Sequence, residues 1–312
     1  MIKQFPYDYV SSALNEWAKD ELKKKNLEFD PQVPAYMQLQ NHLSRLITNK
    51  PRKFSTSNAF HVSSENQKGF SELKKAIEEG KNLNQHLSKL ITNARFVDGL
   101  FDYYGCVHFH LGDTLIQDKK TGSEFIERTG EIALAIVNDD EVFMIETKQH
   151  GSKYPETWTN LSVIEIIHAE RPDLIAKNRV SLLQDISPTI TDDEDILALR
   201  KSGICFAVTV SDGTQYMPSK FGPVVMGLNN KHLNLGAIHL LEMQSKTREI
   251  FFQINNLIKN FKLAKKCTLT NVQLYDLQSD NNSVLKHFKV KINYSKNLVS
   301  SQYIHQFNWV KS

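Results

Sequence analysis

Cysteine is scarce in this chain of 312 residues, which contains three: Cys106, Cys205 and Cys267. No two of them have the CxxC spacing of a zinc knuckle or a redox pair, and an odd number cannot all form disulfides. We therefore expect buried small apolar side chains and a reducing compartment, which favours a cytoplasmic protein.

Long apolar runs are missing as well. No stretch approaches the roughly 18 apolar residues that a membrane-spanning helix needs, and the first residues lack the basic and then apolar pattern of a secretory signal. Gly-rich phosphate loops, nucleophile elbows and dinucleotide fingerprints are also absent. The sequence thus predicts a soluble protein without a membrane partner and without ATP- or NAD-dependent chemistry.

Neither sign of charge dominates. Lys and Arg total 38 against 35 Asp and Glu, which gives a net charge of +3. This balance does not by itself indicate a nucleic-acid partner. Lysine clusters at 23–25, 50–53 and 259–266 are each more typical of solvated faces than of phosphate contacts. Any basic surface must therefore be local.

The first hundred residues have helical periodicity. Apolar residues at three- and four-residue spacing predict helices over 9–25, 35–48 and 69–99, with a loop at 51–65. We therefore expect a helical N-terminal region over 1–100. An eleven-residue segment occurs in it twice, as LQNHLSRLITN at 39–49 and LNQHLSKLITN at 83–93. The repeat predicts two similar helices packed side by side, and His42 and His86 are interpreted as surface histidines of those helices.

Strand patterns follow the helical region. Short apolar segments at 103–111, 131–137 and 142–148 and a helix at 158–171 predict a central mixed αβ core over 101–180, which contains an antiparallel hairpin. The last part, 181–312, is expected to be a C-terminal α+β unit without a catalytic signature. Its predicted elements are a hairpin at 204–217, a helix at 235–261 and strands at 268–277 and 285–294. The fold class predicted for the chain is α+β.

Charged residues gather on the predicted hairpin. A turn centred on Asn138 and Asp139 would set Glu131 directly opposite Glu146, and Lys148 would share a face with Glu146 because strand side chains alternate. Carboxylates that hold Mg²⁺ and a lysine beside the nucleophile are the groups that a metal-assisted phosphodiesterase needs. The hairpin is therefore a candidate catalytic site.

The same hairpin resembles the PD-(D/E)xK, or restriction-endonuclease-like, nuclease superfamily. Gly130-Glu131-Ile132, an apolar strand, a polar turn and Glu146-Thr147-Lys148 align with the family pattern, and Ala133 stands where the family has its metal-binding Asp. The resemblance implies a nuclease of prokaryotic antiviral defence or toxin type that acts on DNA or RNA. It implies Mg²⁺ or Mn²⁺ held by Glu131 and Glu146, with Asp113 as a third ligand and Lys148 aiding the nucleophile.

A second interpretation requires no metal. His108 and His110 share one face of the strand at 103–111, and with Arg128, Lys148 and His150 they could provide acid-base groups and a phosphate clamp. The order of these elements resembles the compact sheet of bacterial messenger-RNA-cleaving toxins, which implies RNA cleavage. The three histidines are also residue types that bind transition metals.

A third interpretation is a non-catalytic adaptor that binds nucleic acid or a partner protein. Ala133 permits this reading, because a nuclease-like core without its metal-binding Asp could retain binding alone. Phosphate affinity would then come from basic residues outside the core and would weaken steeply with added salt. Trp158 and Trp309 are typical of core or interface positions, although either ring could stack on a base.

Overall fold

The computed structural model describes residues 7–96, 98–159, 161–180, 189–202, 206–218, 268–278, 287–296 and 299–308. Helices and sheets are both present among them, which confirms the α+β fold class. The chain divides into two compact units. Unit 1 takes 1–46, 92–95 and 236–312, and unit 2 takes 47–91 and 96–235. These limits differ from the predicted boundaries at 100 and 180, because residues from both ends of the sequence pack together in unit 1.

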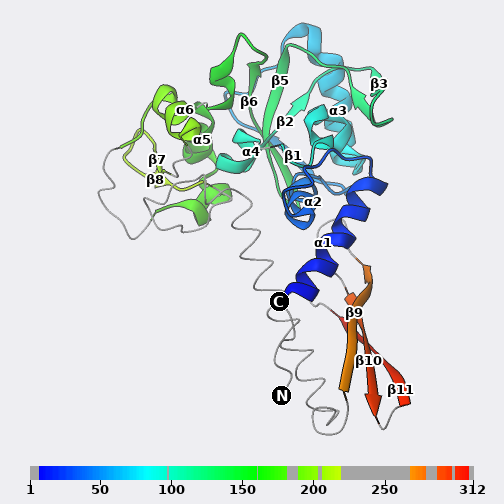
Figure 1. Cartoon of the computed structure of the whole chain (residues 1–312). Helices are drawn as coiled ribbons and strands as arrows, with labels where there is room; N and C mark the ends of the chain where they lie inside the picture. The colour runs from blue at the N-terminus through cyan, green and yellow to red at the C-terminus, as the bar shows by residue number, and fades with distance from the viewer. Residues whose placement is uncertain are drawn as a thin grey trace. The chain divides into compact units, whose positions relative to one another are not determined.

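Unit 1 combines two helices with a three-stranded antiparallel sheet of order β11-β10-β9 (Figure 1). Its elements are α1 (Tyr7–Lys24), α2 (Ala35–Ser44), β9 (Thr268–Gln278), β10 (His287–Lys296) and β11 (Val299–Asn308). Helix α1 contacts both α2 and β9. The sequence predicts β9 and β10 but not β11, and the helix predicted at 235–261 lies outside the described residues.

Unit 2 is built on a four-stranded sheet of order β1-β6-β5-β2 (Figure 1). Its strands are β1 (Lys53–Thr56), β2 (Cys106–His110), β5 (Glu131–Val137) and β6 (Glu141–Gln149). Strand β1 pairs with β6 in parallel, and the other pairs are antiparallel. Two small hairpins accompany the sheet: β3 (Leu115–Gln117) with β4 (Glu124–Ile126), and β7 (Val208–Thr209) with β8 (Gln215–Tyr216).

Helices surround this sheet. They are α3 (Gln67–Glu79), α4 (Gly99–Tyr104), α5 (Leu161–Glu170) and α6 (Asp193–Lys201). Short 3₁₀ turns are η1 (Ser64–Asn66), η2 (Leu83–His86), η3 (Lys89–Thr92), η4 (Pro155–Trp158) and η5 (Pro172–Asn178). The core of one sheet face joins alternate residues of β5 to α5, with Ile132, Leu134 and Ile136 against Val163, Ile164 and Ile167. Burial of each such side chain contributes about 1.5–3 kcal/mol before entropy is counted.

The continuous helix predicted at 69–99 is wrong. Helix α3 ends at Gly80, whose φ of 72° is the left-handed conformation that glycine adopts readily. The Asn82 side chain then accepts a hydrogen bond from the Asn84 backbone and starts η2. The second copy of the repeat therefore forms 3₁₀ turns, whereas the first copy begins within α2. The predicted surface positions of His42 and His86 are also wrong, because both side chains are buried. The predicted loop at 51–65 also contains a strand, β1.

The β5–β6 hairpin carries one extra residue. Ala135 pairs with Met144 but Leu134 pairs with Glu146, so Ile145 is a bulge in β6. A bulge moves every side chain beyond it to the opposite sheet face. The predicted pairing of Glu131 with Glu146 is wrong, because Glu131 pairs with Gln149 instead. Val137 pairs with Val142, so the turn is centred one residue later than predicted, and the bulge shifts the partner of Glu131 by one residue more.

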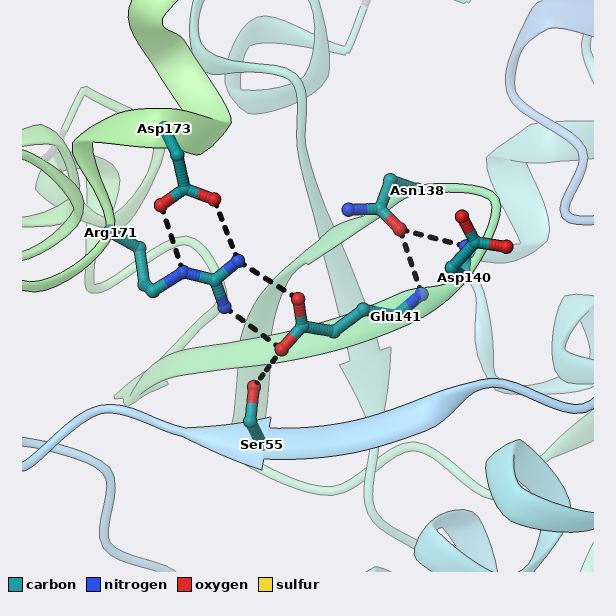
Figure 2. A network of polar contacts seen from close by, with 6 residues as sticks. All are labelled: Ser55, Asn138, Asp140, Glu141, Arg171 and Asp173. Atoms are coloured by element: carbon teal, nitrogen blue, oxygen red, sulfur yellow. Dashed lines mark hydrogen bonds and ion pairs between the residues drawn. The ribbon is translucent and has the colours of Figure 1, made fainter.

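A polar network fixes the start of β6 (Figure 2). The Arg171 guanidinium donates to both carboxylate oxygens of Glu141, at 2.8 and 2.9 Å, and to both of Asp173, at 2.9 and 2.8 Å. Ser55 on β1 donates its hydroxyl to Glu141 at 2.6 Å. The hydrogen bond from Arg171 lowers the pKa of Glu141. The network thus ties the end of α5 to β6 and β1.

Replacing Arg171 should measurably destabilise unit 2. Arg171→Met keeps an aliphatic stem but leaves the Glu141 carboxylate without its cation, which should cost about 2 kcal/mol in the free energy of unfolding by urea. Lys75→Met, which removes an exposed pair with Glu79, should have no measurable effect. Equal stability of the two variants would contradict this role of the network.

Candidate functional site

Strand β2 places two histidines on one face of the sheet, as the alternation predicts. His108 pairs with Leu134 and His110 with Ile132, so both imidazoles share the face that carries the α5 core. Their exposed fractions are 5% and 1%. The two rings meet edge to face, with 5.9 Å between centroids.

A cavity of about 430 Å³ opens beside these rings. Its polar lining is Ser88, Asp98, His108, His110, Arg128 and His150. Its apolar lining includes Leu90, Phe96 and Trp158. The cavity therefore brings together four of the predicted site residues: the three histidines and Arg128.

His150 and Trp158 complete an aromatic cluster. The centroid of His150 lies 5.1 Å from that of His110, and Trp158 lies 5.2 Å from His108 and 6.2 Å from His150. His150 Nδ1 lies 3.0 Å from the Gly130 carbonyl oxygen. A carbonyl can only accept, so Nδ1 carries the proton and Nε2 keeps the lone pair of the neutral ring.

Asp98 lies beside His108. One of its oxygens caps α4 by accepting from the Phe101 N–H at 3.1 Å, and the other lies 3.8 Å from His108 Nδ1. This second separation is within ion-pair range but too long for a hydrogen bond. Burial lowers the pKa of His108, and the Asp98 carboxylate opposes that effect.

His110 is the most buried group of the cavity. Neither of its ring nitrogens has a hydrogen-bond partner among the described residues. Burial lowers its pKa to about 2, and the neighbouring imidazoles and Arg128 add to the effect. His110 is therefore neutral at physiological pH. A buried nitrogen without a partner costs roughly 1–3 kcal/mol, and a bound polar group would recover this cost.

Arg128 provides the positive charge of the cavity. Its side chain is exposed, and Nη2 donates to the Ser88 hydroxyl at 3.2 Å. A guanidinium with further donors beside three imidazoles is suited to an anion such as a phosphate.

Glu131 lies on the other face of the sheet. Its carboxylate accepts hydrogen bonds from the Ser63 hydroxyl at 2.6 Å, the Ser63 N–H and the Asn66 amide at 2.8 Å. Burial alone would raise the pKa of Glu131, but these hydrogen bonds outweigh it and lower the pKa. This carboxylate anchors the segment before α3.

The other predicted metal and nucleophile groups are engaged elsewhere. Glu146 accepts from Ser162 at 2.5 Å and pairs with Lys148 at 2.9 Å. Asp113 pairs with Lys68 at 2.8 Å. Because Glu131 and Glu146 point to opposite faces, they do not form the shared Mg²⁺ or Mn²⁺ site that the resemblance implies. Within the described residues, no three His, Cys, Asp or Glu side chains are grouped to hold a metal ion.

Sequence reasoning missed Ser88, Leu90, Phe96 and Asp98. All four fall in the region assigned to a continuous helix, so none was placed near β2. One sequence signal could have placed Asp98: an Asp followed by Gly99 and apolar residues is typical of a helix start, and such a start here would have interrupted the predicted long helix.

No family model, curated protein or solved structure matches this chain. Among the described residues, no helix combines the length and the apolar character needed to cross a membrane. The function must therefore be argued from the cavity itself.

Glu131→Gln should destabilise the protein, because the new amide turns donors toward the donors of Ser63 and Asn66. We expect a loss of about 1–3 kcal/mol in the free energy of unfolding by urea. Glu65→Gln, an exposed change in the same segment, should leave stability unaltered. An equally stable Glu131→Gln variant would show that this carboxylate is not an anchor.

The buried His110 should make stability fall in acid. Its ordinary pKa of 6.5 drops to about 2 on folding, so below pH 6.5 the unfolded chain takes up a proton that the folded chain refuses. The non-titrating His110→Gln variant should therefore lose ~2 kcal/mol less stability than the parent between about pH 6.5 and pH 5. Urea unfolding at both pH values measures this. His61→Gln, at an exposed position, should keep the parent's full loss, and identical pH curves for both variants would refute the assignment.

Proposed function

We propose that this protein cleaves RNA without a metal cofactor, by attack of a ribose 2′-hydroxyl on the adjacent phosphate. The observation that carries the proposal is the convergence of His108, His110, His150 and Arg128 on one cavity. Neighbouring imidazoles can provide a general base and a general acid, and a guanidinium can neutralise the charge that develops on phosphorus. The resemblance to messenger-RNA-cleaving toxins favours the same chemistry.

The reaction needs no group that the cavity lacks. A base removes the proton of the 2′-hydroxyl, O2′ bonds to phosphorus, and the bond from phosphorus to O5′ breaks. An acid delivers a proton to O5′ as it leaves. The products are a 2′,3′-cyclic phosphate and a 5′-hydroxyl, and no water, metal or oxidant is consumed.

His150 is suited to the role of base. The Gly130 carbonyl holds the proton on Nδ1, so Nε2 is available to accept the proton of the 2′-hydroxyl. His150 is also only partly buried, so a ribose can reach it.

His108 is suited to the role of acid. A general acid must carry a proton when the leaving oxygen departs, and the Asp98 carboxylate favours the charged imidazolium. The bound phosphate would favour it further. His110, between the two in the ring contacts, would donate a hydrogen bond to a phosphate oxygen, and Arg128 would hold another.

A single-ribonucleotide substrate tests the reaction. A DNA oligonucleotide with one internal ribonucleotide should be cut at that position in the presence of a chelator, and should leave a 2′,3′-cyclic phosphate. His108→Ala and His150→Ala should each slow single-turnover cleavage about 10²–10⁴-fold. Lys148→Gln, which changes a residue outside the cavity and retains a hydrogen bond donor for Glu146, should cleave at the parent rate.

Other outcomes support other functions. Cleavage that requires Mg²⁺ or Mn²⁺ and disappears in Glu146→Gln would favour the metal-dependent nuclease. Salt-sensitive binding of nucleic acid without any turnover would favour the adaptor. Either outcome would overturn the metal-free proposal.

A further inference from the structure

We propose, on the basis of the function above, that the substrate is unpaired RNA, and that the cavity receives one nucleotide whose base has left the stack. The juxtaposition behind this inference is a set of buried imidazoles at one side of the cavity and an apolar wall of Trp158, Phe96 and Leu90 at another. The imidazoles define where the phosphate must go, and the wall defines where the base can lie.

The burial of the histidines excludes a duplex on steric grounds. His108 and His110 are 5% and 1% exposed, so a reacting phosphate must enter the cavity to touch them. In an A-form duplex each phosphate is attached to a nucleotide whose base is paired and stacked inside the helix. A nucleotide can enter a cavity of about 430 Å³ only after its base is unpaired. The free-energy cost of unpairing and unstacking is smallest for a nucleotide that is already single-stranded.

The apolar wall provides a surface for the extruded base. Trp158 and Phe96 are half-buried, and Leu90 is 44% exposed although it is apolar. Aromatic side chains stack on bases of any sequence, because every base has a π-face. The wall therefore predicts tolerance of sequence combined with a requirement for an unpaired nucleotide.

Two hydrogen bonds anchor the chain around Trp158. Arg200 donates a hydrogen bond to the Trp158 carbonyl while its guanidinium carbon lies 3.9 Å from the centroid of Tyr103. On the preceding residue, the buried Thr157 hydroxyl donates to the Gln149 carbonyl at 2.6 Å. The indole itself contacts the rings of His108 and His150. An aromatic ring that is already packed loses little freedom when a ligand stacks on it, which strengthens binding. Arg200 is therefore a positioning residue for the wall.

Binding can be measured apart from cleavage. A fluorescently labelled single-stranded DNA lacks the 2′-hydroxyl nucleophile and should bind without being cut. It should bind at least tenfold more tightly than the duplex of the same sequence. Trp158→Ala should weaken single-strand binding about tenfold or more, because stacking on that ring is lost, whereas Trp158→Phe should restore most of it. Ile116→Ala, an exposed apolar change on β3, should bind like the parent.

Cleavage provides the second arm. An RNA hairpin should be cut in its loop or single-stranded tail and not in its stem. Equal cleavage of stem and loop, or equal binding of duplex and single strand, would overturn the substrate assignment and leave the proposed reaction standing. Strand-selective binding that depends on Trp158, without cleavage of any RNA, would instead support the assignment and overturn the reaction. Single-strand binding unaffected by Trp158→Ala would show that the apolar wall is not the base site.

Discussion

One extra residue in β6 decides what each face of the central sheet carries. Ile145 has no partner on β5, and its carbonyl accepts a hydrogen bond from the Ser57 hydroxyl while the Ser57 N–H donates to Met144 at 2.8 Å. The Ser57 hydroxyl thereby satisfies the carbonyl of the bulged residue. Because pairing has a period of two, the bulge turns Glu146 toward the histidine face and leaves Glu131 on the other.

The two faces consequently have different tasks. Toward α3, the carboxylate of Glu131 is saturated by Ser63 and Asn66 and stabilises a loop. Toward α5, His108 and His110 project from the edge strand β2 and line the cavity. The Glu131 carboxylate thus has hydrogen-bond partners, whereas both ring nitrogens of His110 have none among the described residues. A site of unsatisfied, pKa-shifted groups at the edge of a well-packed sheet is where catalysis or binding is most readily supported.

Local sequence patterns were sufficient to predict most strands of the sheet. The arrangement of the candidate site depends instead on pairing between residues far apart in the sequence. Alternation was sufficient for β2, β5 and β6 and for the shared face of His108 and His110. It could not reveal the bulge, because Ile145 fits an apolar strand with or without a partner. Strand β1 lies in a polar segment that has no strand pattern of its own. It is extended because it pairs with β6, and a local pattern does not reveal that pairing. The repeat was misleading because Gly80 and Asn82 precede only its second copy, and without that break Asp98 could not be located beside His108.

The lowered pKa of His108 and the need for a charged acid are compatible once a bound phosphate is considered. Burial lowers the pKa of both His108 and His110, and the nearby Arg128 guanidinium adds to the effect. A phosphate reverses that balance, because its negative charge favours imidazolium and its oxygens satisfy nitrogens that otherwise lack partners. The attraction between phosphate and imidazolium and the hydrogen bonds to the phosphate oxygens are both strong here because His108 and His110 are buried. Electrostatic interactions strengthen as water is excluded, and the same burial lowers the pKa of these two histidines when no anion is bound. Under the proposed function, anion binding would therefore prepare the cavity for proton transfer, while the Glu131 carboxylate stays on the opposite face of the sheet.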